Sequence, residues 1–212
     1  MTDPVSPQRR ERRDGVPGQA FPGVAGLTAD AVPPQRPATL ADAPRIAELM
    51  RASVGELFPR FYGEPETVSA VAYIAHIDLT LIEDGTYFVH EADGEIIACG
   101  GWSRRGKLYT GSGPGDDDLR LIDPATEPAR IRAMFVRADW TRRGLGRAIL
   151  ESCRRAAVAE GFGSLALLAT LPGVPLYRSF GFRETERREI LMPDGVEIEG
   201  VMMTRGVEPL AD

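Results

Sequence analysis

Residues 134–150 read MFVRADWTRRGLGRAIL, a stretch that predicts a strand, a tight turn and the start of a helix. The glycines at positions 144 and 146 permit positive φ angles and let backbone N–H groups approach a ligand without obstruction by Cβ atoms. The first N–H groups of the helix point to the same place, where the helix dipole favours an anion. Three arginines, Arg142, Arg143 and Arg147, add positive charge. The stretch therefore predicts a site for a phosphate or a diphosphate.

Two other kinds of phosphate-binding loop differ from this stretch at a required position. A Walker A loop ends in Gly-Lys-Ser or Gly-Lys-Thr, whereas the sole lysine of this chain is Lys107. A dinucleotide-binding fingerprint requires a third glycine, and Ile149 stands at that position. The sequence therefore argues against both loops.

The stretch lies within an alternation of strands and helices that predicts a mixed α/β fold. Residues 129–136 form the strand before the turn, and the helix after it ends at Gly161, which suits a left-handed C-terminal cap. A buried strand over 165–170, a short helix over 174–180 and a hairpin over 183–204 follow. From its spacing, the inner face of the helix comprises Leu145, Ala148, Ile149, Ser152, Cys153 and Ala156.

Two helices are predicted in the first half of the chain, after a short strand over 36–40. Thr39 or Asp42 caps the first helix. Its apolar face has helical spacing and comprises Ile46, Leu49, Met50, Val54 and Leu57. The second helix is predicted over 66–77, and its apolar residues are Val68, Val71, Ala72 and Ile74.

A hairpin and a long connection lie between these helices and residue 129. Asp93-Gly94 suits a tight turn between strands at 87–89 and 96–99. Residues 103–128 are rich in glycine, aspartate and proline. A connection of this length inside a domain is uncommon and is often functional.

Length and composition are those of a one-domain globular protein. The 212 residues, 43% of them hydrophobic, suffice for one substantial core. We predict a disordered tail at 1–35, a domain at 36–207 and a short C-terminal tail at 208–212. The alternative for the first tail, which carries a cluster of arginines, is an arm that docks on a partner subunit.

Several function classes are disfavoured by the sequence. A formal net charge of −6 argues against a general nucleic-acid-binding protein. No apolar run reaches the roughly 20 residues of a membrane helix, and the N-terminus lacks the apolar region of a secretory signal. Two cysteines do not suggest a disulfide framework, and two histidines without a CxxC motif predict no zinc or other metal site. These features predict a cytoplasmic protein that binds neither nucleic acid nor membrane.

Two motifs, in this order, resemble those of the GNAT superfamily of N-acetyltransferases. Residues 143–148, RGLGRA, match the family's R/Q-x-x-G-x-G/A diphosphate motif, and residues 176–182, LYRSFGF, are similar to its LY-x-x-x-GF segment. Residues 36–42 resemble its opening strand and helix start, so the resemblance covers nearly everything after the tail. It implies the GNAT acyl-CoA N-acyltransferase fold, a mixed, mostly antiparallel sheet with splayed central strands that is flanked by helices.

The resemblance also implies which residues hold acetyl-CoA as cosubstrate. The strand end would bond the pantetheine arm as an added strand, and the turn and helix start would hold the diphosphate. The implied residues are Met134, Phe135, Val136, Arg142, Arg143, Gly144, Leu145, Gly146, Arg147 and Ala148. Tyr177 would be catalytic and donate a proton to the departing thiolate; the alternative is a tyrosine that only packs. Thr170 stands where many members carry asparagine.

The sequence does not identify a general base. Several members carry a glutamate on the strand before the turn, where this chain has Arg130-Ile131-Arg132. The nearby acids, Asp123, Glu127 and Asp116 to Asp118, are interpreted as solvated loop carboxylates, and His76 and His90 as structural. Cys153, inside the helix, is interpreted as a core residue and not as a nucleophile.

We predict direct transfer of an acetyl group from acetyl-CoA to an amine of a small molecule or peptide. One alternative is a domain of the same fold that binds an acyl-CoA without transfer activity. Another is a transferase that uses a different acyl donor or a hydroxyl acceptor. The sequence does not identify the acceptor, and it is compatible with a homodimer.

Overall fold

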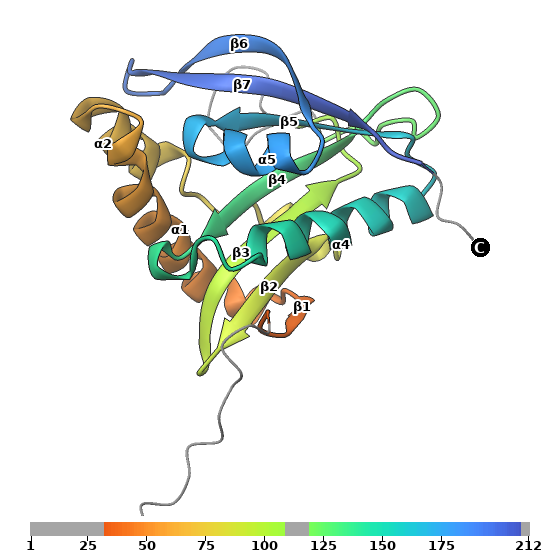
Figure 1. The fold of residues 1–212 in the computed structure, drawn as a ribbon, viewed down its shortest axis with the longest axis horizontal. Coiled ribbons are helices and arrows are strands. Elements are labelled where there is room, and N and C mark those ends of the chain that lie inside the picture. Colours follow the sequence, from red (N-terminus) through yellow and green to blue (C-terminus); the bar gives the residue numbers. More distant parts are fainter. Residues whose placement is uncertain (1–31, 109–118, 209–212) are drawn as a thin grey trace, which may run out of the picture. The chain divides into compact units, whose positions relative to one another are not determined.

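The computed structural model describes residues 32–108 and 119–208 (Figure 1). The predicted tail up to residue 31, the Asp116–Asp118 run and residues 209–212 lie outside the described residues. The strands are β1 (Gln35–Pro37), β2 (Tyr87–Ala92), β3 (Glu95–Ser103), β4 (Ala129–Val136), β5 (Ser164–Thr170), β6 (Arg183–Leu191) and β7 (Glu197–Gly206). The α-helices are α1 (Ala43–Leu57), α2 (Glu64–Tyr73), α3 (Leu79–Glu83), α4 (Leu145–Ala159) and α5 (Val174–Ser179).

The strands form a sheet in the order β1-β2-β3-β4-β5-β7-β6. Each neighbouring pair is antiparallel except β4 and β5, which run parallel to each other. This arrangement confirms the predicted mixed, mostly antiparallel sheet. β1 begins at Gln35, one residue before the predicted domain boundary.

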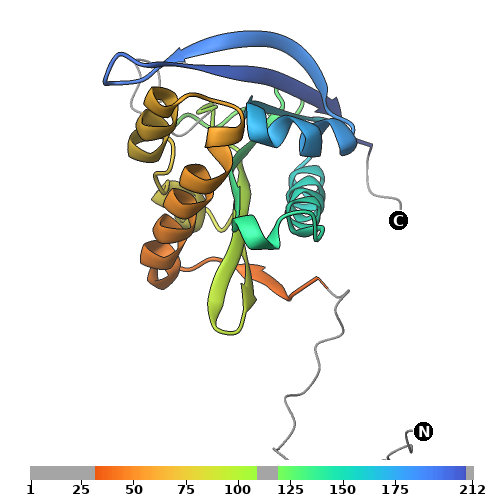
Figure 2. The same cartoon turned by 60° about the vertical axis from the view of Figure 1, so that its left-hand side comes forward.

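Helices cover both faces of this sheet. Figure 2 shows α1 and α2, in orange and brown, on one side of the strands and α4 and α5, in teal and blue, on the other. One core cluster lies under α4 and α5, and a second lies under α1, α2 and α3. Within the described part of the chain, no helix is long and apolar enough to cross a bilayer.

Helix α1 and helix α4 use the faces that their spacing predicts. Ile46, Leu49, Met50 and Val54 are buried in α1, whereas Leu57 is half-buried. In α4, Leu145, Ile149 and Cys153 are buried, and Leu150 and Ala157 join them in place of the half-buried Ala148, Ser152 and Ala156. Gly161 has φ 89° after the last turn, as expected of a left-handed cap.

The predicted second helix is wrong in its bounds and in part of its face, because Val71 and Ile74 pack against the core but Val68 and Ala72 are exposed. The structure has α2 from Glu64 to Tyr73 and a separate α3, because Pro65 suits a helix start and the chain leaves the helix before Asp78. Val68 is 62% exposed, while Ser69 and Ala70 are buried. The small face turns inward because Ser69 Oγ donates to Asp194 Oδ1, at 3.0 Å, in the turn between β6 and β7.

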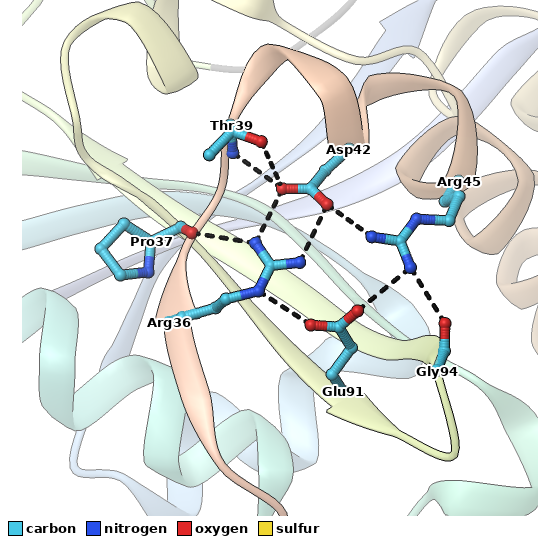
Figure 3. Close-up of polar contacts among 7 residues, drawn as sticks. All are labelled: Arg36, Pro37, Thr39, Asp42, Arg45, Glu91 and Gly94. Atoms are coloured by element: carbon cyan, nitrogen blue, oxygen red, sulfur yellow. Dashed lines mark hydrogen bonds and ion pairs between the residues drawn. The ribbon is translucent and has the colours of Figure 1, made fainter.

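Four charged side chains join β1, the start of α1 and β2 (Figure 3). Arg36 donates to both oxygens of Asp42, at 2.8 and 2.9 Å, and to Glu91 at 2.8 Å. Arg45 contacts Asp42 at 2.7 Å and Glu91 at 3.1 Å. Asp42 also accepts hydrogen bonds from the Thr39 N–H and hydroxyl, so the two predicted capping residues bond to each other. We call Arg36, Asp42, Arg45 and Glu91 the β1–α1 network.

The hairpin turns follow the predicted glycines. Asp93 and Gly94 have φ angles of 52° and 79° between β2 and β3, the left-handed pair that a two-residue hairpin turn requires. Gly195, with φ 85°, lies in the turn between β6 and β7.

Candidate acetyltransferase site

The two parallel strands at the centre of the sheet separate after their first residues. Along the described strands, β4 pairs with β5 only at Ala129–Leu165 and Arg130–Ala166. From Ile131 onward, the β4 edge that faces β5 therefore has no ladder partner. This splay, which the resemblance implied, leaves room for an extended group between the strands.

A bulge in β4 lies at the same place. Ala133 has φ 52°, a left-handed angle that is uncommon for a residue with a side chain, and the register with β3 shifts opposite Gly100. A Cβ at Gly100 would collide with Met134 Sδ, so a larger residue there would force the Met134 side chain to move. The Tyr87 hydroxyl donates to the Ala133 carbonyl at 2.7 Å and holds the bulge.

The predicted pantetheine residues follow this bulge. Phe135 pairs with Cys99 and Val136 with Ala98, so the segment Met134–Val136 stays fixed to β3. Ser53 Oγ of α1 donates to the Val136 carbonyl at 2.9 Å. The segment is thus held from the β3 side, next to the open edge.

A pocket of about 80 Å³ lies between the splayed strands. It is lined by residues of both core clusters, and Met134, Phe135, Thr170 and Tyr177 are among them. The structure therefore brings the predicted catalytic tyrosine and two predicted binding residues to one pocket. Thr170, at the end of β5, also lines it.

Tyr177 lies in α5 and is 8% exposed. Burial raises the pKa of its hydroxyl well above the usual value, so the proton is retained at neutral pH. Its ring packs edge-on against Phe182 at 5.9 Å. A Cβ at Gly173 would lie 2.8 Å from the Tyr177 ring, so glycine admits the ring at this position.

The strand end before α5 is anchored by a second tyrosine. The Tyr62 hydroxyl accepts from the Leu171 N–H and donates to the Glu199 carbonyl, both at 2.7 Å. This contact joins the segment after α1 to β7 and to the short turn that leads into α5. It therefore helps to position the helix that carries Tyr177.

The predicted diphosphate turn has an open helix N-terminus. Gly144 precedes α4 with φ 84°, Arg142 has φ 66°, and no described side chain caps the helix. The Ala148 N–H donates to the Gly144 carbonyl at 2.9 Å as the first helical bond. The N–H groups of the three residues between them, Leu145, Gly146 and Arg147, therefore lack an acceptor within the helix.

The role that was predicted for the second glycine of this turn needs correction. Gly146 lies within α4, is buried and does not have a positive φ angle. A Cβ at this position would lie 2.7 Å from Leu176 Cδ2 of α5. Glycine at 146 therefore favours close packing of α4 on Leu176, and of the two glycines only Gly144 supplies the left-handed conformation.

Three exposed arginines surround this N-terminus. Arg143 stacks on the Trp140 ring at 4.5 Å, and Arg147 lies over Phe180 at 5.5 Å. Neither these two nor Arg142 forms an ion pair with a residue that the structure describes. We call Arg142, Arg143 and Arg147 the α4 arginines. They add positive charge beside open N–H donors.

Neither Glu127 nor Asp123, the described acids that were considered as bases, lines the pocket. Arg120 holds Glu127 with two bonds of 2.7 and 2.8 Å and lowers its pKa to about 2. Asp123 accepts from Ala125 N–H at 3.0 Å within the same loop. Both serve the local turn, as their interpretation as loop carboxylates predicts.

Neither histidine and neither cysteine lies at the pocket. His90 is buried in β2, bonds the Pro33 carbonyl at 2.7 Å and has its pKa lowered by burial. His76 is exposed, with Nε2 2.7 Å from the Ala72 carbonyl. Cys99 and Cys153 are fully buried, and burial raises the pKa of both thiols, that of Cys99 to about 12. These thiols are core residues.

Among the described lining residues, one charged residue was not predicted from the sequence. Arg132, which is 4% exposed, lines the pocket, and its Nη2 lies 2.9 Å from Asp78 Oδ2. Lys107 Nζ is 3.9 Å from the same oxygen. An arginine inside a largely apolar strand is the sequence signal, because its described partner Asp78 lies 54 positions away.

Comparisons with known proteins agree with this geometry. A profile of the acetyltransferase (GNAT) family matches residues 51–182. A search of curated proteins gave no match.

Solved structures share the fold at low sequence identity. A GCN5-related N-acetyltransferase from Rhodopseudomonas palustris is 17% identical, with a TM-score of 0.65 over 86% of this chain and 100% of that one. PaiA N-acetyltransferase from Thermoplasma acidophilum, solved in complex with coenzyme A, is 13% identical, with a TM-score of 0.57 over 82% and 98%. YncA from Salmonella typhimurium, solved with acetyl-CoA, is 16% identical, with a TM-score of 0.54 over 84% and 96%.

The family match covers more than half of the chain, and it includes the splayed strands, the α4 turn and Tyr177. The chain belongs to the acetyltransferase (GNAT) family and is a GNAT N-acetyltransferase.

Proposed function

We propose that this protein transfers the acetyl group of acetyl-CoA directly to an amine. The observation that carries the proposal is the open N-terminus of α4 beside the splayed strands. There, N–H groups without a helical acceptor, the left-handed Gly144 and the α4 arginines meet. Such a terminus binds phosphate groups well. The coenzyme A complexes of two proteins of this fold support the choice of ligand.

The proposed binding residues have two tasks. The turn and first helical residues hold the diphosphate, and the β4 segment bonds the pantetheine arm along its open edge. The turn comprises Arg142, Arg143, Gly144, Leu145, Gly146, Arg147 and Ala148, and the β4 segment comprises Met134, Phe135 and Val136. With Gly146 helical and buried, its contribution is its N–H group and not a special φ angle.

Acetyl-CoA, when bound, supplies the acetyl group as a thioester. The amine forms a C–N bond while the C–S bond breaks. Tyr177 is protonated at neutral pH, as a tyrosine with its pKa at or above the ordinary value must be, and its hydroxyl donates that proton to the departing sulfur. An N–H of the open β4 edge stabilises the negative charge that develops on the carbonyl oxygen. The amine's proton passes to water, since no described pocket residue is a carboxylate.

The test compares Tyr177→Phe with the wild-type protein in calorimetry with CoA and in acetyl transfer to a panel of amines. We expect kcat to fall on the order of 100-fold to 10,000-fold. The Kd for CoA should change less than about twofold, because the tyrosine hydroxyl bonds no described residue. Tyr73→Phe, a half-buried tyrosine of α2 outside the pocket lining, is the matched control.

Two results would contradict the proposal. Full turnover by Tyr177→Phe would exclude the tyrosine as the acid. CoA binding by the wild-type protein without transfer to any amine would instead favour a binding domain of the same fold.

A further inference from the structure

Two arginines at the start of β6 and near the end of β7 have no described carboxylate partner. Arg183 is exposed and Arg205 is half-buried, and neither guanidinium forms an ion pair or a hydrogen bond with a residue that the structure describes. The other arginines of α5 and of this hairpin each pair with a glutamate; they are Arg178, Arg187 and Arg188. Two positive charges therefore remain without a described counterion at one end of the hairpin.

These two arginines line a hollow in the surface. Its other described lining residues are Gly181, Thr204 and Gly206. Arg183 stands opposite Thr204 in the ladder between β6 and β7, next to Arg205. Since the two glycines have no side chains, the side chains of the hollow are two guanidiniums and one hydroxyl. These groups are the donors that a phosphate group accepts from, and arginine matches phosphate geometry well.

The hollow adjoins the proposed diphosphate site through one aromatic ring. Arg205 lies over the Phe180 ring at 4.5 Å, and Arg147, one of the α4 arginines, lies over the same ring at 5.5 Å. Helices α4 and α5 lie side by side here (Figure 2), with Gly146 against Leu176. One ring therefore contacts a cation of the diphosphate site and a cation of the hollow.

Coenzyme A carries a third phosphate group, on the 3′-oxygen of its adenosine ribose. Only the ribose separates this group from the diphosphate, so an adenosine that begins at the α4 turn brings its 3′-phosphate to a neighbouring cation. We propose that Arg205 and Arg183 bind the 3′-phosphate of CoA and make the protein selective for CoA over dephospho-CoA. This inference rests on the proposed function, because it extends the site of the same cosubstrate.

The test measures, by calorimetry with the full-length protein, the Kd for CoA and the Kd for dephospho-CoA, which lacks only the 3′-phosphate. We expect dephospho-CoA to bind on the order of tenfold to a hundredfold more weakly, the effect of charge-assisted hydrogen bonds to one phosphate group. The difference should shrink as the salt concentration rises, because the hollow is open to solvent. Equal affinity for the two ligands would overturn the inference.

Two variants assign this preference to the hollow. The double substitution Arg183→Gln and Arg205→Gln should lower the preference to less than about threefold and leave the Kd for dephospho-CoA within about twofold of the wild-type value. Arg187→Gln is the matched control and should keep the preference, since Arg187 lies on the same hairpin but pairs with Glu199 at 2.6 Å. A preference that survives in the double variant would contradict the assignment.

The single substitution Arg183→Gln covers the case in which the double variant does not fold. Arg183 is exposed and contacts no described ring, so its loss leaves the packing on Phe180 intact. This variant should weaken the binding of CoA and leave that of dephospho-CoA unchanged. Equal weakening of both ligands would contradict the inference.

Failure of this inference differs from failure of the proposed function. A protein that binds neither ligand contradicts both proposals, whereas equal binding of the two ligands contradicts only the inference on the 3′-phosphate. Arg143→Gln separates the two phosphate sites, because Arg143 stacks on Trp140 at the diphosphate turn. It should weaken both ligands alike. A loss confined to CoA in this variant would place the 3′-phosphate at the turn and contradict the inference.

Discussion

Two groups of arginines in this molecule have opposite surroundings. In the β1–α1 network, Arg36 and Arg45 share Asp42 and Glu91 at 2.7 to 3.1 Å, so two positive charges meet two negative ones. The α4 arginines stand beside open N–H groups and form no ion pair with described residues. The charges of the first group are paired within the fold, and we propose that those of the second group bind the diphosphate of CoA.

The proposed function predicts that this difference separates structural arginines from arginines that bind CoA. Both groups lie close to a helix start, and the sequence shows arginine, aspartate and glutamate near both. The distinguishing feature is the pairing. The network joins three elements that are distant in the sequence, whereas the α4 arginines lie on one turn and its helix. Substitutions in the first group should affect stability, and those in the second should affect CoA binding.

The largest effect on stability is expected from Asp42→Asn, which removes the shared acceptor of the network. Breaking a buried ion pair costs about 3–5 kcal/mol. Because Arg36 and Arg45 remain 37% and 40% exposed, we expect a free energy of unfolding lower by about 2 kcal/mol. Urea denaturation measures it. A loss of less than about 0.5 kcal/mol in the free energy of unfolding, or weaker CoA binding by the folded variant, would contradict the distinction between the two groups of arginines.

A smaller effect is expected from the double substitution Arg143→Gln and Arg147→Gln. Loss of two cations beside the helix start should weaken CoA binding about tenfold, or about 1.4 kcal/mol, and reduce the dependence of binding on salt. The free energy of unfolding should change by less than about 0.5 kcal/mol. Calorimetry at two ionic strengths measures the first, and urea denaturation the second.

Arg155→Gln is the matched control on the same helix. Arg155 pairs with Glu151 at 3.1 Å and is 66% exposed. Its loss should leave CoA affinity unchanged. Equal weakening by the control would mean that general charge, and not the helix start, governs binding.

Gly146→Ala tests whether the second glycine of the turn matters for helix packing or for CoA binding. The added Cβ meets Leu176, so we expect a loss of about 1 kcal/mol in stability after the better helix propensity of alanine is included. CoA affinity should change less than about threefold, because the N–H group remains. When Leu176→Ala is added to Gly146→Ala, the loss of stability should be smaller than the sum of the losses in the two single variants. Additive losses would show that the two residues do not interact.

The smallest effect is the dependence of network stability on pH. Hydrogen bonds from Arg36 hold the pKa of Asp42 below its usual value, and Arg36 also lowers that of Glu91. The stabilisation is therefore complete above the unfolded-state pKa of about 4 and is lost as pH falls toward the folded-state pKa. The stability difference between wild type and Asp42→Asn should thus shrink from pH 6 to pH 3. A constant difference would contradict this.

The regular elements near the site could be predicted because their patterns are local. The bounds of β4, the inner face of α4 and the turn at Gly144 follow from apolar periodicity and glycine positions within a few residues. Helix α2 could not be predicted correctly, because its inner face uses Ser69 and Ala70 against a distant hairpin. The splay of β4 from β5 came from the resemblance alone.

Other features of the site depend on contacts between distant residues. The left-handed Ala133 depends on Gly100 in the neighbouring strand and on the Tyr87 hydroxyl. The position of Arg132 depends on Asp78, which is 54 residues earlier in the chain. In the sequence, Arg132 indicated only that this strand lacks the glutamate that several family members carry there.

The most direct test is an NMR titration of ¹⁵N-labelled protein with CoA, which reports on the α4 amides themselves. The account predicts the largest shifts at the N–H groups of Leu145, Gly146 and Arg147, with the amides of the β1–α1 network unchanged. No shift at the start of α4, or larger shifts around Asp42 than around Gly146, would contradict the claim that this helix start binds the diphosphate.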